Sequence, residues 1–217
     1  MLSPTSLLLG IAYLCSSVDA ATWYFLRYNL PSTQSFLSFS GALAVPKLPK
    51  AGTYYLWPGL QPTDNSGVYQ NVLDGRSGTW WIGSGWCCSN PSLPWGSGFN
   101  TVQGDSVRFE NTRGASAWTS VLTKGSQTVT NSFALSSKTF NQVLFAIELT
   151  GVSWDFGPLV FSNVVIVSRL SSPKAWCTNA PENYNSATNY AISGVSASVS
   201  NNVVTCKINS VALQSPK

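Results

Sequence analysis

Glu148 is the residue whose position most strongly suggests chemistry. It lies inside residues 144–149 (LFAIEL), an otherwise apolar run that is typical of a strand covered on both faces. An unpaired carboxylate is costly in such a run, so buried acids are either partnered or functional. Burial also raises the pKa of a carboxyl group toward the range that is useful for proton transfer. We therefore treat Glu148 as a candidate catalytic residue.

The absence of histidine narrows the chemistry further. None of the 217 residues is histidine, which excludes Ser–His–Asp and Cys–His nucleophile pairs and a His-ligated metal. Asp64, Asp74 and Asp105 stand beside Asn, Gly or Ser, where turn chemistry explains them. A glycosidase needs two opposed carboxylates, and only Glu148 is well placed for that role. Any catalysis must use carboxylates, amides, hydroxyls or backbone groups.

Aromatic residues form the second candidate group. The chain has nine Trp, and we predict that four of them contact a substrate: Trp57, Trp80, Trp81 and Trp86. Neighbours on a strand point to opposite faces, so the Trp80-Trp81 pair sends one ring inward and one outward. For any single ring, packing in the core is an equally good explanation. As a group, these rings favour a groove that binds a sugar or an extended polymer.

The first twenty residues resemble a secretory signal peptide. An apolar run at 7–14 precedes a small-residue cleavage site that ends at Ala20, and the run is too short to span a bilayer. We therefore expect a secreted, extracellular protein. No later run is long and apolar enough to cross a membrane.

Four cysteines remain after the leader is removed: Cys87, Cys88, Cys177 and Cys206. An even number in an exported chain predicts disulfides. Cys87 and Cys88 could each reach a different C-terminal partner, because neighbours on a strand face opposite ways. The alternative is a Cys177–Cys206 bond with an adjacent Cys87–Cys88 pair, and the spacing does not decide between them. Without a CxxC motif or histidine, no metal site is expected.

The charged residues do not suggest a polyanionic partner. The chain carries 12 basic and 8 acidic residues, and loss of the leader removes one acidic residue. The basic residues are scattered, so no nucleic-acid footprint is predicted. No cofactor and no membrane partner are expected either, and the oligomeric state stays open. The expected partner is an extracellular protein or polysaccharide.

Strands must position these side chains. Alternating or apolar runs separated by Gly, Pro, Asn and Asp turns predict strands at 54–57, 78–82, 105–110, 117–122, 127–133, 143–149, 159–168, 189–195 and 202–208. No segment of helical length has a 3.6-residue period. The prediction is an all-β protein, an antiparallel β-sandwich of the concanavalin A-like or jelly-roll-like kind. After the leader at 1–20, we expect a sandwich domain at 21–170 and a disulfide-stapled extension of it at 171–217.

Several short segments resemble the eqolisin family of glutamic peptidases in order and spacing. They are 40–46 (SGALAVP), 54–60 (YYLWPGL), 68–70 (VYQ), 104–107 (GDSV) and 155–163 (DFGPLVFSN). The resemblance implies a pair of packed antiparallel sheets with the substrate on a concave face. It also implies a Gln that stabilises the oxyanion and a Glu that acts as general base on water.

The resemblance places Gln70 on the family's Gln. Glu148 reaches the catalytic Glu position only if the hairpin before Asp155 is shortened. Aligned instead on residues 155–157, Glu148 falls on a later Glu of the strand, and Leu144 takes the catalytic position. Two functions remain: an acid-acting secreted endopeptidase that uses Gln70 and Glu148, or a divergent, inactive member. The inactive member would be a lectin-like sandwich that binds a glycan or peptide in its aromatic groove.

Overall fold

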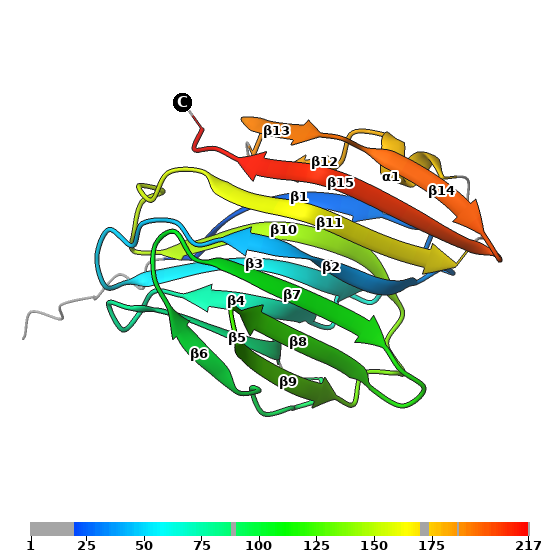
Figure 1. The fold of residues 1–217 in the computed structure, drawn as a ribbon, viewed down its shortest axis with the longest axis horizontal. Helices are drawn as coiled ribbons and strands as arrows, with labels where there is room; N and C mark the ends of the chain where they lie inside the picture. The colour runs from blue at the N-terminus through cyan, green and yellow to red at the C-terminus, as the bar shows by residue number, and fades with distance from the viewer. Residues whose placement is uncertain (1–19, 88–89, 170–173, 186, 217) are drawn as a thin grey trace, which may run out of the picture.

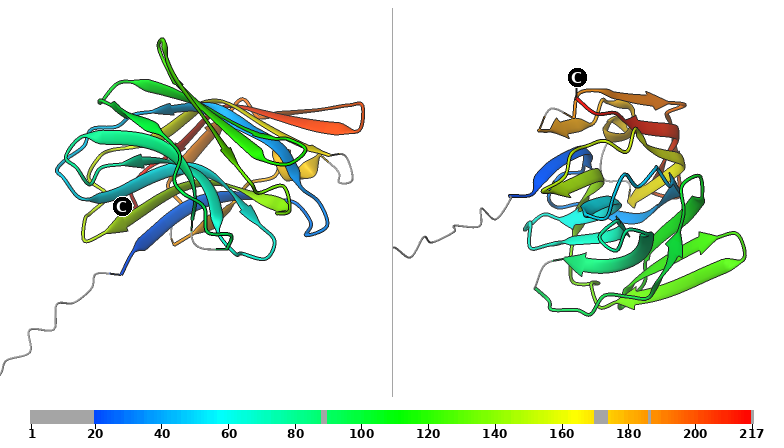
Figure 2. Two further views of the ribbon diagram at one scale, coloured as in Figure 1. Left: turned by 90° about the horizontal axis from the view of Figure 1, so that it is seen from below. Right: turned by 90° about the vertical axis from the view of Figure 1, so that its left-hand side faces the viewer.

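The structure is a computed structural model that describes residues 20–87, 90–169, 174–185 and 187–216. Within these residues the chain forms two large antiparallel sheets packed face to face and one short helix, α1 (Ala175–Thr178) (Figure 2). The predicted β-sandwich is confirmed. The predicted leader, except Ala20, lies outside the described residues, as does Cys88.

The first sheet has seven strands. Their spatial order is β12 (Glu182–Tyr184), β1 (Thr22–Asn29), β10 (Phe140–Thr150), β3 (Thr53–Pro62), β4 (Val68–Asp74), β5 (Trp80–Cys87) and β6 (Gly98–Thr101). Seven strands of the second sheet follow in the order β13 (Tyr190–Ser193), β15 (Val203–Leu213), β11 (Leu159–Arg169), β2 (Phe36–Ala44), β7 (Ser106–Arg113), β8 (Trp118–Lys124) and β9 (Gln127–Phe133). The eighth strand, β14 (Ser196–Ser200), also pairs with β15.

All nine predicted strands coincide with observed strands, several of which are longer than predicted. The periodicity did not predict β1, β2, β4, β6, β12 or β14. Strand β4 shows why, because its residues are apolar or buried on both faces and so lack alternation. β6 and β12 have only four and three residues, which is too short for a period to be recognised.

The main core fills the space between the sheets. Phe39 of β2 and Phe145 of β10 meet edge to face with ring centroids 5.4 Å apart, and Phe109 of β7 lies 5.0 Å from Phe39. All three side chains are fully buried. Aromatic contacts of this geometry contribute beyond the area that they bury.

A buried polar network also joins the sheets, beneath β4 and β5. Asn71 Nδ2 donates to Ser84 Oγ at 2.9 Å and to Ser120 Oγ at 2.8 Å, and Asn111 Nδ2 donates to Asn71 Oδ1 at 2.6 Å. All four residues are inaccessible to solvent. Because Asn71 is fixed toward the core, its neighbour Gln70 must face the opposite, open side of the sheet.

The C-terminal segment joins one edge of both sheets (Figure 1). β12 extends the first sheet by pairing with β1, while β13 and β14 pair with β15, which itself pairs with β11 of the second sheet. The predicted extension at 171–217 therefore contributes strands to both layers.

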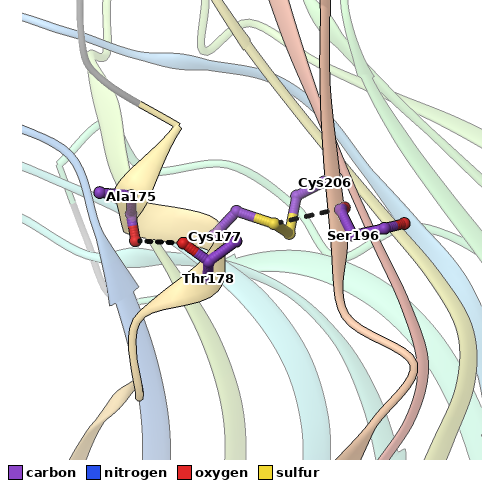
Figure 3. The surroundings of a disulfide bond; sticks show 5 residues. All are labelled: Ala175, Cys177, Thr178, Ser196 and Cys206. Atoms are coloured by element: carbon purple, nitrogen blue, oxygen red, sulfur yellow. Dashed lines mark hydrogen bonds between the residues drawn. A yellow bond between two sulfur atoms is a disulfide. The ribbon is translucent and has the colours of Figure 1, made fainter.

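The Cys177–Cys206 disulfide connects α1 to β15 across a Cα–Cα distance of 5.6 Å (Figure 3). Cys177 Sγ also lies 3.5 Å from the carbonyl oxygen of Ser196 on β14. The bond confirms the pairing that staples the C-terminal hairpin. Cys87 is disulfide-bonded as well.

Candidate functional site

A groove of about 840 Å³ lies on the open face of the seven-stranded sheet, the face turned away from the main core. Its lining combines aromatic, amide and charged side chains from β3, β4, β5, β6, β10 and two loops. These residues are Tyr55, Gln70, Val72, Asp74, Arg76, Ser77, Trp81, Cys87, Trp95, Asn100 and Glu148.

Strand register brings five groove residues, with Trp23 beyond the groove's β10 side, into one row perpendicular to the strands. Successive cross-strand partners on β1, β10, β3, β4, β5 and β6 are Trp23, Glu148, Tyr55, Asp74, Trp81 and Asn100. Residues in one such row point to the same face of a sheet. Each neighbouring pair in the row is therefore separated by one strand spacing.

Glycines let two indole rings lie against the sheet. The Trp81 ring covers Gly83 on its own strand and Gly98 on β6, and a Cβ atom at either glycine would overlap it. The Trp95 ring covers Gly85 in the same way and is 48% exposed. The alternation of Trp81, Gly83 and Gly85 along β5 therefore builds an aromatic floor from side-chain-free backbone.

The loop that carries Trp95 is tied to the second sheet through Asn131 of β9. The Asn131 side chain accepts from the Ser97 amide at 2.8 Å and donates to the Ser97 carbonyl at 2.9 Å. The Gly96 amide donates to the Ser84 carbonyl at 2.9 Å. Asn131 thus pairs with the loop as a strand backbone would, and these bonds hold Trp95 beside the groove.

Glu148 is half-buried at the β10 side of the groove, as its apolar surroundings predicted. Burial is the main cause that raises the pKa of its carboxyl group from 4.5 to about 7. The nearby Trp57 indole opposes part of this rise by favouring the charged form. The Trp57 N–H is itself buried and has no partner within hydrogen-bonding geometry in the described structure.

Gln70 also lines the groove, near the Trp95 end. Its side chain is 6% exposed, and its carbonyl oxygen has no hydrogen-bond partner among the described residues. A buried, unpaired amide oxygen costs free energy until a ligand donor meets it. Gln70 is therefore a suitable polar contact for a bound molecule.

Gln70 and Glu148 line the same groove but do not stand at the same level of the sheet. Gln70 lies opposite Gly59, and Gly59 lies opposite Leu144, whereas Glu148 lies opposite Tyr55. They are two strand spacings apart across the sheet and four residues apart along it. In a flat sheet this places their Cα atoms about 16 Å apart. The catalytic assignment of this pair stays a prediction.

The Trp57 indole lies between these two residues. Its ring contacts Gly59, the residue between Gln70 and Leu144 in the ladder, and a Cβ at Gly59 would lie 2.9 Å from the ring. Together with Val72, Leu144 and Ala146, Trp57 forms a second apolar cluster on the open face. Apolar side chains thus occupy the level of the sheet at which Gln70 lies.

A fixed charged pair lies at the other end of β4. The Arg76 guanidinium bonds both carboxylate oxygens of Asp74, with Nη2–Oδ2 at 2.7 Å and Nε–Oδ1 at 3.1 Å. It also lies over the Tyr55 ring at 5.3 Å from the centroid. The pair offers hydrogen-bonding groups with little net charge.

The four predicted aromatic residues occupy three different environments. Trp81 lines the groove, Trp57 is buried in the open-face cluster, and Trp80 and Trp86 lie in the core between the sheets. The outward and inward members of the Trp80-Trp81 pair follow strand alternation as expected. Only Trp81 among the four is placed to contact a ligand in the groove directly.

The sequence analysis missed several groove residues and also Trp23, which lies beside the groove. Trp23 lies on a strand that the periodicity did not reveal, and Asp74 and Arg76 read as an ordinary turn. The Trp-x-Gly-x-Gly pattern at 81–85 was the available signal for the aromatic floor. The sequence did not show what this pattern builds, because the aromatic floor also needs Trp95 and Gly98, which lie outside β5.

Metal-binding clusters and membrane-spanning helices are both absent from the part of the chain that the structure describes. No group of three or more Cys, Asp or Glu side chains could hold a metal ion. No helix among them has the length and apolar character needed to cross a bilayer.

Among solved structures, the chain is similar to scytalido-glutamic peptidase, crystallised with a transition state analog inhibitor. The two share 16% identity at a TM-score of 0.51, over 88% of this chain and 98% of that one. No family model and no curated protein matches the sequence. The similarity supports the eqolisin-like fold that the short segments predicted, and fold alone does not transfer activity.

Proposed function

We propose that the protein is a secreted, lectin-like glycan-binding protein that holds a neutral sugar chain in the groove without hydrolysing it. One observation carries this proposal: the Trp57 ring occupies the face between Gln70 and Glu148, while the Trp81 and Trp95 rings remain available to a ligand. A general base must reach the attacking water, and the oxyanion donor must reach the oxygen of the carbonyl that this water attacks. The two side chains must therefore converge on one point. The separation of Gln70 and Glu148 disfavours that arrangement.

The groove is better suited to sugars than to a peptide backbone. An extended peptide gains affinity by pairing with a sheet edge, but the groove floor is the middle of a sheet whose backbone groups are already paired. Sugar rings have flat C–H faces that stack on indole rings laid against the floor. The paired Asp74 and Arg76 leave the groove little net charge, which suits an uncharged chain.

Secretion is part of the proposal. The Cys177–Cys206 disulfide is of the kind that persists in oxidising compartments, and it agrees with the signal-peptide pattern at the N-terminus.

A second candidate is peptide-bond hydrolysis by Gln70 and Glu148. The specific observation in its favour is that both side chains line one groove and that the pKa of Glu148 is raised to about 7. Such a carboxyl group can accept a proton from water near neutral pH.

Calorimetric titration of the purified protein with soluble, uncharged β-linked oligosaccharides tests the proposal. We expect binding, and we expect Trp81→Ala to weaken it at least tenfold while Val102→Ala, which alters an exposed side chain outside the groove, leaves it unchanged. The same preparation should not cleave denatured protein at acidic or at neutral pH. Absence of glycan binding would overturn the proposal. Cleavage that is lost in Glu148→Gln would establish the second candidate instead.

A further inference from the structure

We infer that the glycan crosses the strands, stacking on Trp81 at one end and on Trp23 at the other, and that it is an extended, uncharged β-linked chain of at least four sugars. This inference rests on the proposed glycan binding and adds the direction, length and class of the ligand.

The cross-strand row defines the path. Trp23 on β1 and Trp81 on β5 stand at the same level of the sheet, linked by the register through Glu148, Tyr55 and Asp74. Both indoles are partly exposed on the open face. Four strand spacings separate them, about 19 Å at 4.8 Å per strand. That is close to the length of four units in an extended β-linked glycan.

The residues between the two indoles suit the hydroxyl groups of a sugar chain. Glu148 and Tyr55 can donate or accept hydrogen bonds, and the Asp74–Arg76 pair supplies fixed acceptors and donors. An anionic sugar would meet the carboxylates of Glu148 and Asp74 with a single guanidinium nearby, so the row favours an uncharged chain. Aromatic ends with a polar middle would hold both the faces and the edges of the sugars.

A path along the strands is of similar length on β5, where the groove lining runs from Trp81 to Cys87, six residues or about 20 Å. Between Gln70 and Asp74 the groove extends four residues along β4, about 13 Å. At the Gln70 end, the Trp95 ring covers Gly85, the cross-strand partner of Gln70. We favour the cross-strand path because it has a partly exposed indole at each end and polar side chains between them.

Titrations with β-1,4-linked glucose and N-acetylglucosamine oligomers of two, four and six units test the inference. We expect at least a tenfold gain in affinity between two and four units. Trp23→Ala should bring the ratio of four-unit to two-unit affinity toward one, and Trp23→Phe should restore part of that ratio. Trp81→Ala should lower the affinity for oligomers of every length while leaving the ratio unchanged. Val199→Ala, an exposed residue of β14, is the matched control.

The outcomes separate the inference from the proposed function. If no oligomer binds, glycan binding itself is wrong. If disaccharides bind as tightly as longer oligomers, or if Trp23→Ala leaves the length dependence intact in a protein that unfolds at the wild-type temperature, the groove binds glycan but the cross-strand path is wrong.

Discussion

Glu148 couples the groove to pH through its half-buried carboxyl group. The folded protein holds this proton up to about pH 7, whereas the unfolded chain releases it near pH 4.5. Between these values the unfolded state binds fewer protons than the folded state, so the free energy of unfolding falls as pH rises. The pKa values of Asp64, Asp105 and Glu182 are lowered instead, which puts their titration below this window.

We therefore predict that Glu148→Gln removes a pH dependence of stability between about pH 4.5 and 7. The loss in the wild-type protein should be on the order of 1–2 kcal/mol, after allowance for the carboxyl group's partial contact with water. Urea unfolding across this range measures it, with Glu110→Gln as the control on an exposed carboxylate. An equally steep dependence in Glu148→Gln would show that another group is responsible.

The sequence identified Glu148 as a groove residue but did not predict its position relative to Gln70. Glu148 stood out because one acid inside an apolar run is unusual, and the structure places it in the groove. Its relation to Gln70 depends on the register of β10, β3 and β4, which pairs Gln70 with Gly59 and Gly59 with Leu144. Sequence spacing alone does not fix that register, because a hairpin change of a few residues shifts it.

The loop before β6 is the element that most directly shapes the groove. Its Trp95 ring packs on Gly85 but is half exposed, and the Asn131–Ser97 pair and the Gly96 amide hold the backbone beside it. Trp81 is different, because it is part of a paired strand. Changes in the loop should therefore affect Trp95 selectively.

Asn131→Ala should loosen this loop and lower stability by about 1 kcal/mol, because two partly exposed hydrogen bonds are lost. Hydrogen exchange of the Ser97 amide should accelerate, and glycan affinity should fall. Asn131→Asp keeps the acceptor for the Ser97 amide but turns a second oxygen toward the Ser97 carbonyl, so it should not restore the loop. Thr130→Ala serves as the neighbouring control on β9. Unchanged exchange at Ser97 in Asn131→Ala would contradict the proposed role of this contact.

Strand prediction succeeded where a run alternates clearly, as in β7, or is continuously apolar, as in β10, and failed for β4, which does neither. β7 alternates buried and exposed residues throughout and was recognised. β4 has Gln70 and Val72 buried on the open face as well as Tyr69 and Leu73 in the core, so no period identifies it. The apolar cluster on the open face, which includes Val72, therefore removes the alternation by which β4 could have been recognised.

Across the whole molecule, the two sheets are connected at both edges by different means. At one edge, β12 joins the first sheet, β13–β15 join the second, and Cys177–Cys206 links α1 to β15. At the other, Asn131 of β9 binds the loop between β5 and β6. The disulfide at the first edge is a covalent connection between two residues that are 29 positions apart in the sequence.

We predict that the double variant Cys177→Ser/Cys206→Ser loses about 3 kcal/mol of stability, the magnitude expected for a loop of this size. Thermal and denaturant unfolding measure the loss. Ser193→Ala/Ser210→Ala, a cross-strand pair in the same extension without a covalent link, is the control. Wild-type stability in the double cysteine variant would show that the extension is held by strand pairing alone.

The brevity of the outermost strands has a consequence for how copies of this protein behave at high concentration. β6, β12 and β13 have four, three and four residues, so each presents only a short row of free backbone groups, whereas β9, at the other edge of the second sheet, has seven residues. Long exposed edges invite another chain to add a strand and seed aggregates. The three short edges give an incoming chain little to align with, so association by strand addition would have to begin at the longer edge of β9.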